Sequence, residues 1–237
     1  MTIRIAITII LVLWSDSGFS KGVWLDRNRV IFTENSSQAI TVSARNDSNF
    51  RYLVTPMIFY SDASGNITDS KSDFFFIDPP IFTMNPDSVN NFRIFNRQID
   101  ESSNQEKLYY LSVFFAPERS GVEVVSFGLK MVLKLFVRNK HISNITLKDT
   151  IDKIKAKRNE KNIIFLQNNS PLWMTLHSVN ASGYDIPLPE NMLPPYGKLY
   201  LNYSGAISND YLKVKIYDEN GLVLPLESYK EVYIHDE

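Results

Sequence analysis

Residues 129–138 read LKMVLKLFVR, and this stretch decides the class of fold. Apolar side chains recur at every second position, in contrast to the period of about 3.6 residues that marks an amphipathic helix. The same apolar lane starts earlier, at Val125 and Phe127, and continues through Leu129 to Leu133. The residues between them include small or polar ones, such as Gly128. The alternation predicts a β-strand with one apolar face.

The period of two extends over most of the first half of the chain. Between residues 23 and 137, short β-rich runs alternate with turn signals such as NDSN at residues 46–49. About seven short strands at this spacing are typical of an immunoglobulin-like sandwich. Residues 139–162 are rich in lysine, and strands resume at Ile163. We therefore predict an all-β protein with an N-terminal domain at residues 21–139 and a smaller sandwich at residues 140–237. Residues 140–147 are the expected linker, followed by a polar edge or a short helix.

Length and composition exclude several classes of function. The chain has 237 residues, which suits two domains of ordinary size. Its formal net charge is −1, which argues against a nucleic-acid partner held by a basic field. Because the sequence has no cysteine, disulfides and thiolate metal sites are ruled out. We expect neither a metal nor a cofactor.

The first 20 residues have the pattern of an export signal. They read MTIRIAITIILVLWSDSGFS, with one cation, a short apolar core and small residues before Lys21. The apolar core would span about 15 Å as a helix, about half of a membrane's hydrocarbon layer. We therefore expect a cleaved signal peptide and a mature protein without stable membrane insertion.

The sequence carries no recognisable catalytic motif. It has no nucleophile elbow, phosphate-binding loop, dinucleotide fingerprint or zinc-protease helix. Its three histidines, His141, His177 and His235, are far apart in the chain. The prediction is a protein that is not an enzyme, and a hydrolase with a carboxylate pair is the weakest hypothesis.

Two cations occur in otherwise apolar strands. Arg29 lies in WLDRNRVIF at residues 24–32, and Lys134 is flanked by Leu133 and Leu135. One interpretation puts Lys134 on the solvated side of a sandwich. The other is an anion clamp, in which the guanidinium and the ammonium together hold a carboxylate.

The lane from Val125 to Leu133 also has two interpretations. It is either the inward face of a core strand or an exposed edge that offers its apolar side chains to another chain.

Several short motifs resemble the periplasmic pilus chaperones, the PapD-like family of the chaperone–usher pathway. They are LDRNRVIF at 25–32, FIDPPIF at 76–82, EKLYYL at 106–111 and LKLFVR at 133–138. The resemblance covers nearly all of the sequence after residue 20, and the second domain shares it weakly, through YDENG at 217–221. It implies two immunoglobulin-like β-sandwich domains in a boomerang arrangement.

The resemblance also implies roles for individual residues. By position, Arg29 and Lys134 bind the C-terminal carboxylate of a pilus subunit. Val125, Phe127 and Leu129 form the donor lane, which completes the fold of that subunit by donor-strand complementation.

An ion network between the domains is implied as well. The positions that match it are Glu106, Arg138 and Asp218. Asn139 departs from the family, which usually has proline after this arginine.

The expected function is a periplasmic chaperone that binds, folds and caps fimbrial subunits and delivers them to an outer-membrane usher. An exposed apolar edge invites self-association, so a self-capping homodimer is expected when no subunit is bound. The alternative is a secreted immunoglobulin-like adhesion or ligand-binding module, with the apolar strand internal and Lys134 solvated.

Overall fold

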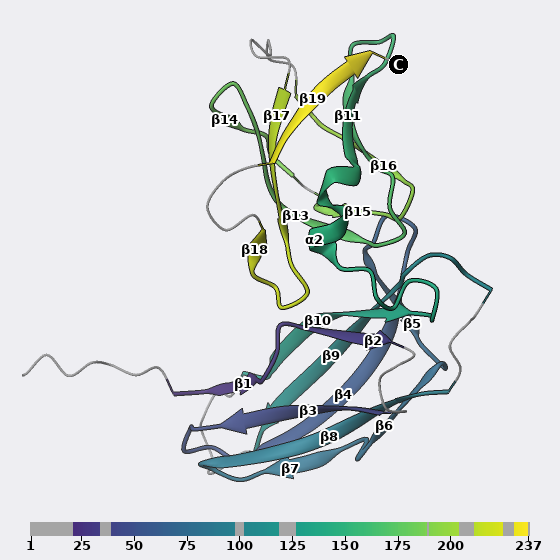
Figure 1. The fold of residues 1–237 in the computed structure, drawn as a ribbon. Helices are drawn as coiled ribbons and strands as arrows, with labels where there is room; N and C mark the ends of the chain where they lie inside the picture. The colour runs from purple at the N-terminus through teal and green to yellow at the C-terminus, as the bar shows by residue number, and fades with distance from the viewer. Residues whose placement is uncertain are drawn as a thin grey trace, which may run out of the picture.

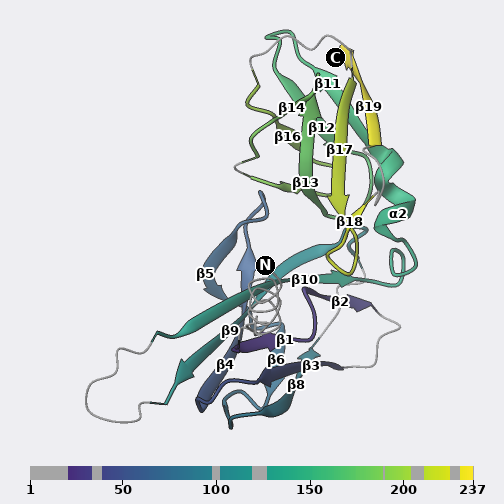
Figure 2. The same ribbon diagram turned by 90° about the vertical axis from the view of Figure 1, so that its left-hand side faces the viewer.

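The structure is a computed structural model that describes residues 21–33, 39–97, 102–118, 127–188, 190–203, 211–224 and 230–236. The predicted signal peptide, residues 1–20, and Val125 of the predicted donor lane lie outside these ranges. The described chain is built almost entirely of strands, so the predicted all-β class is confirmed. Figures 1 and 2 show two bodies of strands that meet end to end at an angle.

The first body, which we call the first unit, consists of residues 23–138 and is a sandwich of two sheets. One sheet has the order β1-β3-β8-β6, and its strands are β1 (Val23–Leu25), β3 (Ala39–Asn46), β8 (Ser88–Asn96) and β6 (Phe75–Asp78). The other has the order β2-β10-β9-β4-β5, with β7 beside β4. Its strands are β2 (Arg29–Thr33), β10 (Leu129–Arg138), β9 (Lys107–Pro117), β4 (Tyr52–Ser61), β5 (Ile67–Lys71) and β7 (Phe82–Met84).

The chain changes sheets between its first two strands. β1 pairs antiparallel with β3 in one sheet, whereas β2 pairs parallel with β10 in the other. The crossing, residues 26–28, is fixed at Asp26, whose backbone N–H donates to the Ser43 carbonyl at 2.9 Å. The Asp26 carboxylate in turn accepts from the Ser43 N–H at 3.1 Å. These bonds hold the chain to β3 shortly before β2 begins.

The core of the first unit lies between its two sheets. It follows from the alternation, because the inward positions of facing strands, such as Val30, Phe92, Leu111 and Leu135, are fully buried. Pro56 lies in the part of β4 between the residues that pair with β7 and those that pair with β5. Neither strand pairs with β4 at this position, so a proline, which has no N–H to donate, is tolerated there.

The second unit, residues 154–236, is a curved sheet around its own core. Its order is β14-β13-β17-β19-β11-β12-β16, with β15 beside β13 and β18 beside β17. The strands are β11 (Ile154–Arg158), β12 (Ile164–Asn168), β13 (Met174–Ala181), β14 (Tyr184–Asp185), β15 (Met192–Leu193), β16 (Lys198–Tyr200), β17 (Tyr211–Tyr217), β18 (Val223–Leu224) and β19 (Lys230–Asp236). Before β11 come the short helix α2 (Leu147–Thr150), capped by Thr146, and the 3-10 turn η1 (Ile151–Lys153).

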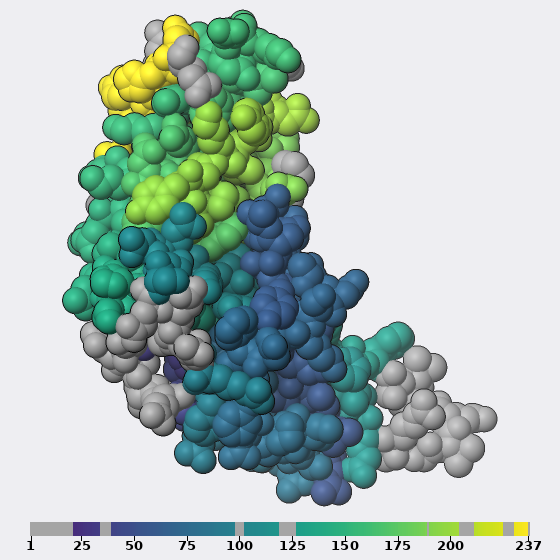
Figure 3. All heavy atoms as spheres, turned by 90° about the vertical axis from the view of Figure 1, so that its right-hand side faces the viewer, coloured from purple at the N-terminus to yellow at the C-terminus, as the bar shows by residue number. Residues whose placement is uncertain are grey.

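A small apolar cluster joins the two units. Phe136, Leu108 and Tyr110 of the first unit pack against Trp173 and Met192 of the second. The first unit's sheet with β10 therefore turns the upper part of its outer face toward the second unit, whereas the lower ends of β9 and β10 extend beyond the body of the molecule (Figures 2 and 3). Among the described residues, no helix has the length and apolar character needed to cross a membrane.

Candidate functional site

Arg29 and Lys134, which are 105 positions apart in the sequence, lie side by side in the structure. Arg29 is the first residue of β2, and Lys134 is its register partner in β10. Both belong to the face that carries Phe136 and is turned toward the second unit, because side chains two positions apart in a strand share a face. The Arg29 guanidinium lies over the Phe136 ring, 5.7 Å from its centre. The fold thus puts two cations on one face of two adjacent strands.

The electrostatics of this pair favour an anionic ligand. Burial, together with the charge of Arg29, lowers the pKa of Lys134 to about 8. Burial also lowers the pKa of Arg29, opposed by the acidic groups of Asp218, Glu106 and Glu219. The Nη1 atom of Arg29 is buried and has no hydrogen-bond partner among the described residues. A buried donor without an acceptor is costly, and a carboxylate would supply charge-assisted acceptors to both cations.

The edge of β10 beside this pair is open. β9 pairs with residues 129–137 of β10, but β2 pairs only from Lys134 onward. Along residues 129–133, the outer edge of β10 has no strand partner in the part of the chain that the structure describes. A pocket of about 380 Å³ lies against this edge, between Trp24, Asn28 and Val132. The open edge therefore ends at Lys134, the residue that pairs with Arg29.

The described residues of the predicted donor lane are exposed. Phe127 is 83% exposed and Leu129 is 44% exposed. The register of β10 against β9 is continuous from residue 129 to residue 137. Leu129 and Lys134 consequently lie on opposite faces, as the alternation predicts. Gly128 is covered by the ring of Phe114, because an added Cβ would lie 2.5 Å from a ring atom.

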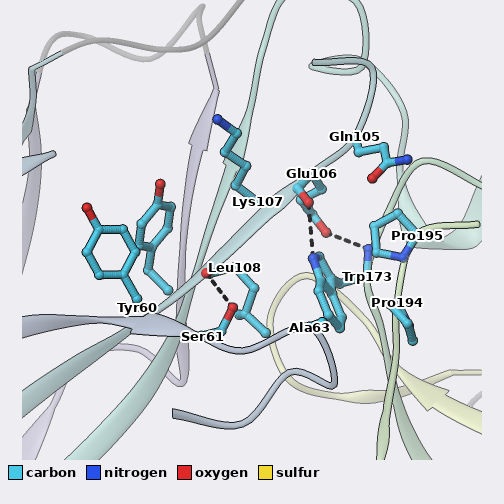
Figure 4. Close-up of a pocket in the computed structure, with 11 residues that line it drawn as sticks. Tyr60, Ser61, Ala63, Gln105, Glu106, Lys107, Leu108, Trp173, Pro194 and Pro195 are labelled. Carbon is cyan, nitrogen blue, oxygen red and sulfur yellow. Dashed lines mark hydrogen bonds between the residues drawn. The ribbon is translucent and has the colours of Figure 1, made fainter. Parts of the chain in front are cut away.

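A buried ion network connects the two units next to this site. Arg138 Nε donates to Glu106 Oε1 at 2.6 Å, and both side chains are almost fully buried. The other oxygen of this carboxylate accepts from the Trp173 N–H at 2.8 Å, while the Trp173 indole donates to the Glu106 carbonyl at 3.0 Å (Figure 4). Burial raises the pKa of Glu106, and the charge of Arg138 opposes this shift. Glu106 is thus bonded to the second unit and to Arg138 together.

The structure places Glu219, rather than the predicted Asp218, in contact with Arg138. Glu219 Oε1 accepts from Arg138 Nη2 at 3.4 Å and from the Leu147 N–H at 2.6 Å. Asp218 instead stabilises the turn at residues 218–222, because its Oδ1 accepts from the backbone N–H groups of Asn220 and Leu222. Sequence reasoning missed Glu219, although its carboxylate is adjacent to the predicted one.

Asn139 takes a structural role at the position where the family usually has proline. Its side chain donates to the Ser103 carbonyl and accepts from the His141 N–H. It is buried and so fixes the chain directly after Arg138. Nearby, a second pocket of about 400 Å³ opens at the joint between the units, and its lining includes Tyr60 and Lys107 of the first unit and Trp173 and Pro194 of the second (Figure 4).

Comparison with known proteins gives consistent matches. The sequence model of the family "Pili and flagellar-assembly chaperone, PapD N-terminal domain" matches residues 22–143. "Chaperone protein LpfB" of Salmonella typhimurium is 27% identical over 195 residues, which cover 81% of each chain. The SafB chaperone of Salmonella enterica, solved in complex with the SafA pilin, superposes with a TM-score of 0.76. It is 20% identical, and the match covers 92% of this chain and 98% of that one. The periplasmic chaperone SfaE has a TM-score of 0.69 at 23% identity, covering 90% and 99% of the two chains.

Proposed function

Because the chain belongs to the PapD-like family of pili and flagellar-assembly chaperones, we propose that it captures a pilus subunit through the open edge of β10 and the cation pair beside it. The protein is a periplasmic, non-enzymatic chaperone of the chaperone–usher pathway. The anchor consists of Arg29 and Lys134, and it binds the C-terminal carboxylate of the subunit. The donor lane consists of Val125, Phe127 and Leu129, and it fills the groove that the subunit leaves open.

The direction of the added strand follows from β2. An incoming strand along residues 129–133 of β10 lies in line with β2, which runs parallel to β10. If it also runs parallel, its carboxyl end meets Arg29, the first residue of β2. A strand of the opposite direction would bring an amino terminus, which the two cations repel. The anchor therefore selects the parallel direction.

The donor lane supplies the apolar part of the affinity. Phe127 and Leu129 are exposed in the free protein, and burial of each such side chain contributes about 1.5–3 kcal/mol. Main-chain hydrogen bonds along the open edge add to this, and the alternate side chains fill pockets of the partner. The terminal carboxylate fixes the register, since a slip of one residue would turn every side chain to the other face.

One observation supports this proposal above the others: the buried Nη1 of Arg29 has no acceptor among the described residues, beside a lysine that is itself largely desolvated. An adhesion or ligand-binding module with a solvated Lys134 and an internal apolar strand does not account for it. Nor does that alternative account for a Phe127 that is 83% exposed.

Two further partners belong to the proposal. The loaded chaperone delivers its subunit to an outer-membrane usher. Without a subunit, two copies cap each other along the open edges of β10, because an exposed apolar edge readily pairs with another chain.

Co-production with a pilus subunit encoded next to this chain's gene tests the proposal. We expect Arg29→Ala or Lys134→Ala to lower the amount of subunit recovered from the periplasm by about tenfold or more, the loss for one charge-assisted bond. Lys71→Ala serves as the control, because Lys71 is an exposed lysine on the distant strand β5. Unchanged recovery with both anchor variants would show that the anchor assignment is wrong.

A further inference from the structure

The turn between β17 and β18, residues 218–222, reaches from the second unit to the first. Asp218 and Gly221 build it: the Asp218 carboxylate accepts two backbone N–H groups, and the Gly221 N–H donates to the Asp218 carbonyl at 3.1 Å. Gly221 has a φ of +78°, a conformation that side chains disfavour. In Figure 2 this turn lies directly beside the first unit, near β2 and β10.

The tip of this turn contacts Asn28, the residue that immediately precedes the anchor residue Arg29. The side-chain amide of Asn28 donates to the Asn220 carbonyl at 3.4 Å. A Cβ on Gly221 would lie 3.0 Å from the Asn28 Cβ, which is tighter than ordinary contact. Gly221 is therefore needed for its backbone conformation and also for the close approach to Asn28.

The other side of the turn is fixed to the ion network. Glu219 bonds to Arg138 and to the N–H of Leu147, and Arg138 is bonded to the buried Glu106. The turn thus lies between this buried ion network and the anchor. It also brings the carboxylate of Asp218 close enough to Arg29 to favour the charged guanidinium.

We infer that the turn at residues 218–222 is a positioning element of the carboxylate anchor: through Asn28 it fixes the start of β2, so that Arg29 and Lys134 present their charges to one carboxylate. Asn28 and Gly221 are positioning residues, and they act through Arg29. This inference rests on the proposed function. It adds that the second unit, which does not carry the anchor, controls how tightly the anchor holds its ligand.

The test compares two synthetic peptides with the C-terminal sequence of the co-encoded pilus subunit, one ending in a free carboxylate and the other in an amide. Their affinities for the full chain are measured by fluorescence anisotropy. The ratio of the two affinities measures the contribution of the anchor alone, because strand pairing and apolar contacts are common to both peptides. A merely structural role of the turn would lower both affinities and leave the ratio unchanged.

Gly221→Ala is the main variant, and Gly183→Ala is its matched control. Gly183 also has a positive φ, +91°, in a turn of the second unit, but a Cβ there would meet nothing within 4 Å. Both variants therefore introduce similar backbone strain, and only the first disturbs Asn28. We expect Gly221→Ala to lower the acid-to-amide ratio about tenfold, as for one misaligned charge-assisted bond, and Gly183→Ala to leave it unchanged.

Asn28→Ala is the second variant, to be used if Gly221→Ala does not fold, because it removes the same contact without backbone strain. We expect it to lower the ratio in the same direction. Equal losses for both peptides, or a ratio as high as that of the original chain, overturn the positioning role. A wild-type chain that does not distinguish the two peptides overturns the proposed anchor itself, so the two failures are distinguishable.

Discussion

Arg29 and Lys134 are register partners in the parallel pair of β2 and β10, at the point where β2 begins and the open edge of β10 ends. Like charges at such opposed positions repel each other, and both side chains are largely removed from water. The free protein therefore keeps an unfavourable charge arrangement that a carboxylate bound at the proposed anchor would relieve.

Lys134→Met should separate stability from binding. Removing one of two repelling, desolvated cations is expected to raise the free energy of unfolding by about 1 kcal/mol. The same variant should lose its preference for a peptide with a free carboxylate. Urea denaturation and the acid-to-amide affinity ratio measure the two effects. The exposed control Lys71→Met should change neither, and a destabilised Lys134→Met would contradict the prediction.

The affinity for a free carboxylate should begin to fall near the pKa that Lys134 has in the free chain. The pKa of Lys134 is lowered to about 8, so the side chain is charged below this pH and loses its proton above it. Affinity should be flat from about pH 5, above which the peptide carboxylate is fully ionised, to about pH 8, and should then fall by at most about tenfold per pH unit. Tyr110, the register partner of Lys134 on β9, stays neutral in this window because its pKa is raised to about 12.

The stability of the free chain should move in the opposite direction over the same window. The lysine pKa is lower in the folded chain than its ordinary value of 10.5, so the unfolded chain binds more protons between these values. The contribution of Lys134 to the free energy of unfolding therefore rises from pH 8 to about 10.5. In Lys134→Met, this contribution and the fall in affinity should both be absent. A pH profile shared by the two proteins would exclude Lys134 as its source.

Phe127→Asp should abolish capture of the subunit without affecting the fold. Phe127 is 83% exposed, so the substitution removes few internal contacts, whereas in the complex it would bury a charge against an apolar groove. Subunit recovery and thermal unfolding are the two measurements. Tyr184→Asp is the matched control, since Tyr184 is an aromatic residue of the second unit that is 73% exposed. Undiminished recovery with Phe127→Asp would exclude the donor lane.

Removing one member of the buried ion pair should be strongly destabilising. Glu106→Ala leaves the charge of Arg138 almost fully buried, which costs about 3–5 kcal/mol. Because Trp173 loses its bond to the same carboxylate, the joint between the units should loosen as well. Urea denaturation measures the first effect and the fluorescence of Trp173 the second. Glu219→Gln should cost less, as its side chain is 26% exposed, and equal losses would contradict this assignment.

The sequence was sufficient to single out the two cations of the proposed anchor but not to show their arrangement. A charge within an alternating apolar strand is a local signal, and it singles out Arg29 and Lys134 without any knowledge of the fold. Their adjacency depends on a parallel pairing between the beginning and the end of the first unit. Such a pairing is set by tertiary packing, and no local pattern specifies its register.

The acidic residue of the second unit in the ion network was predicted by resemblance, and no local pattern could test that choice. Alternation ends with β17, and in the turn that follows, neighbouring side chains no longer point to opposite faces in a regular way. The acidic residues Asp218 and Glu219 are therefore equivalent in sequence, and backbone geometry alone decides that Glu219 meets Arg138. The roles of Trp173 and Phe136 at the joint were likewise not predictable, because they depend on how the two units meet.

The crossing of the chain at residues 26–28 determines the length of the open edge of β10. Its position is pinned by the bonds between Asp26 and Ser43, and it determines where β2 starts to occupy the edge of β10. The start of β2 limits how many residues of β10 a guest strand can pair with. It also determines the residue of β10 at which that strand ends. An insertion there would let β2 cover more of the edge of β10, which would shorten the guest strand and change the residue at which that strand ends.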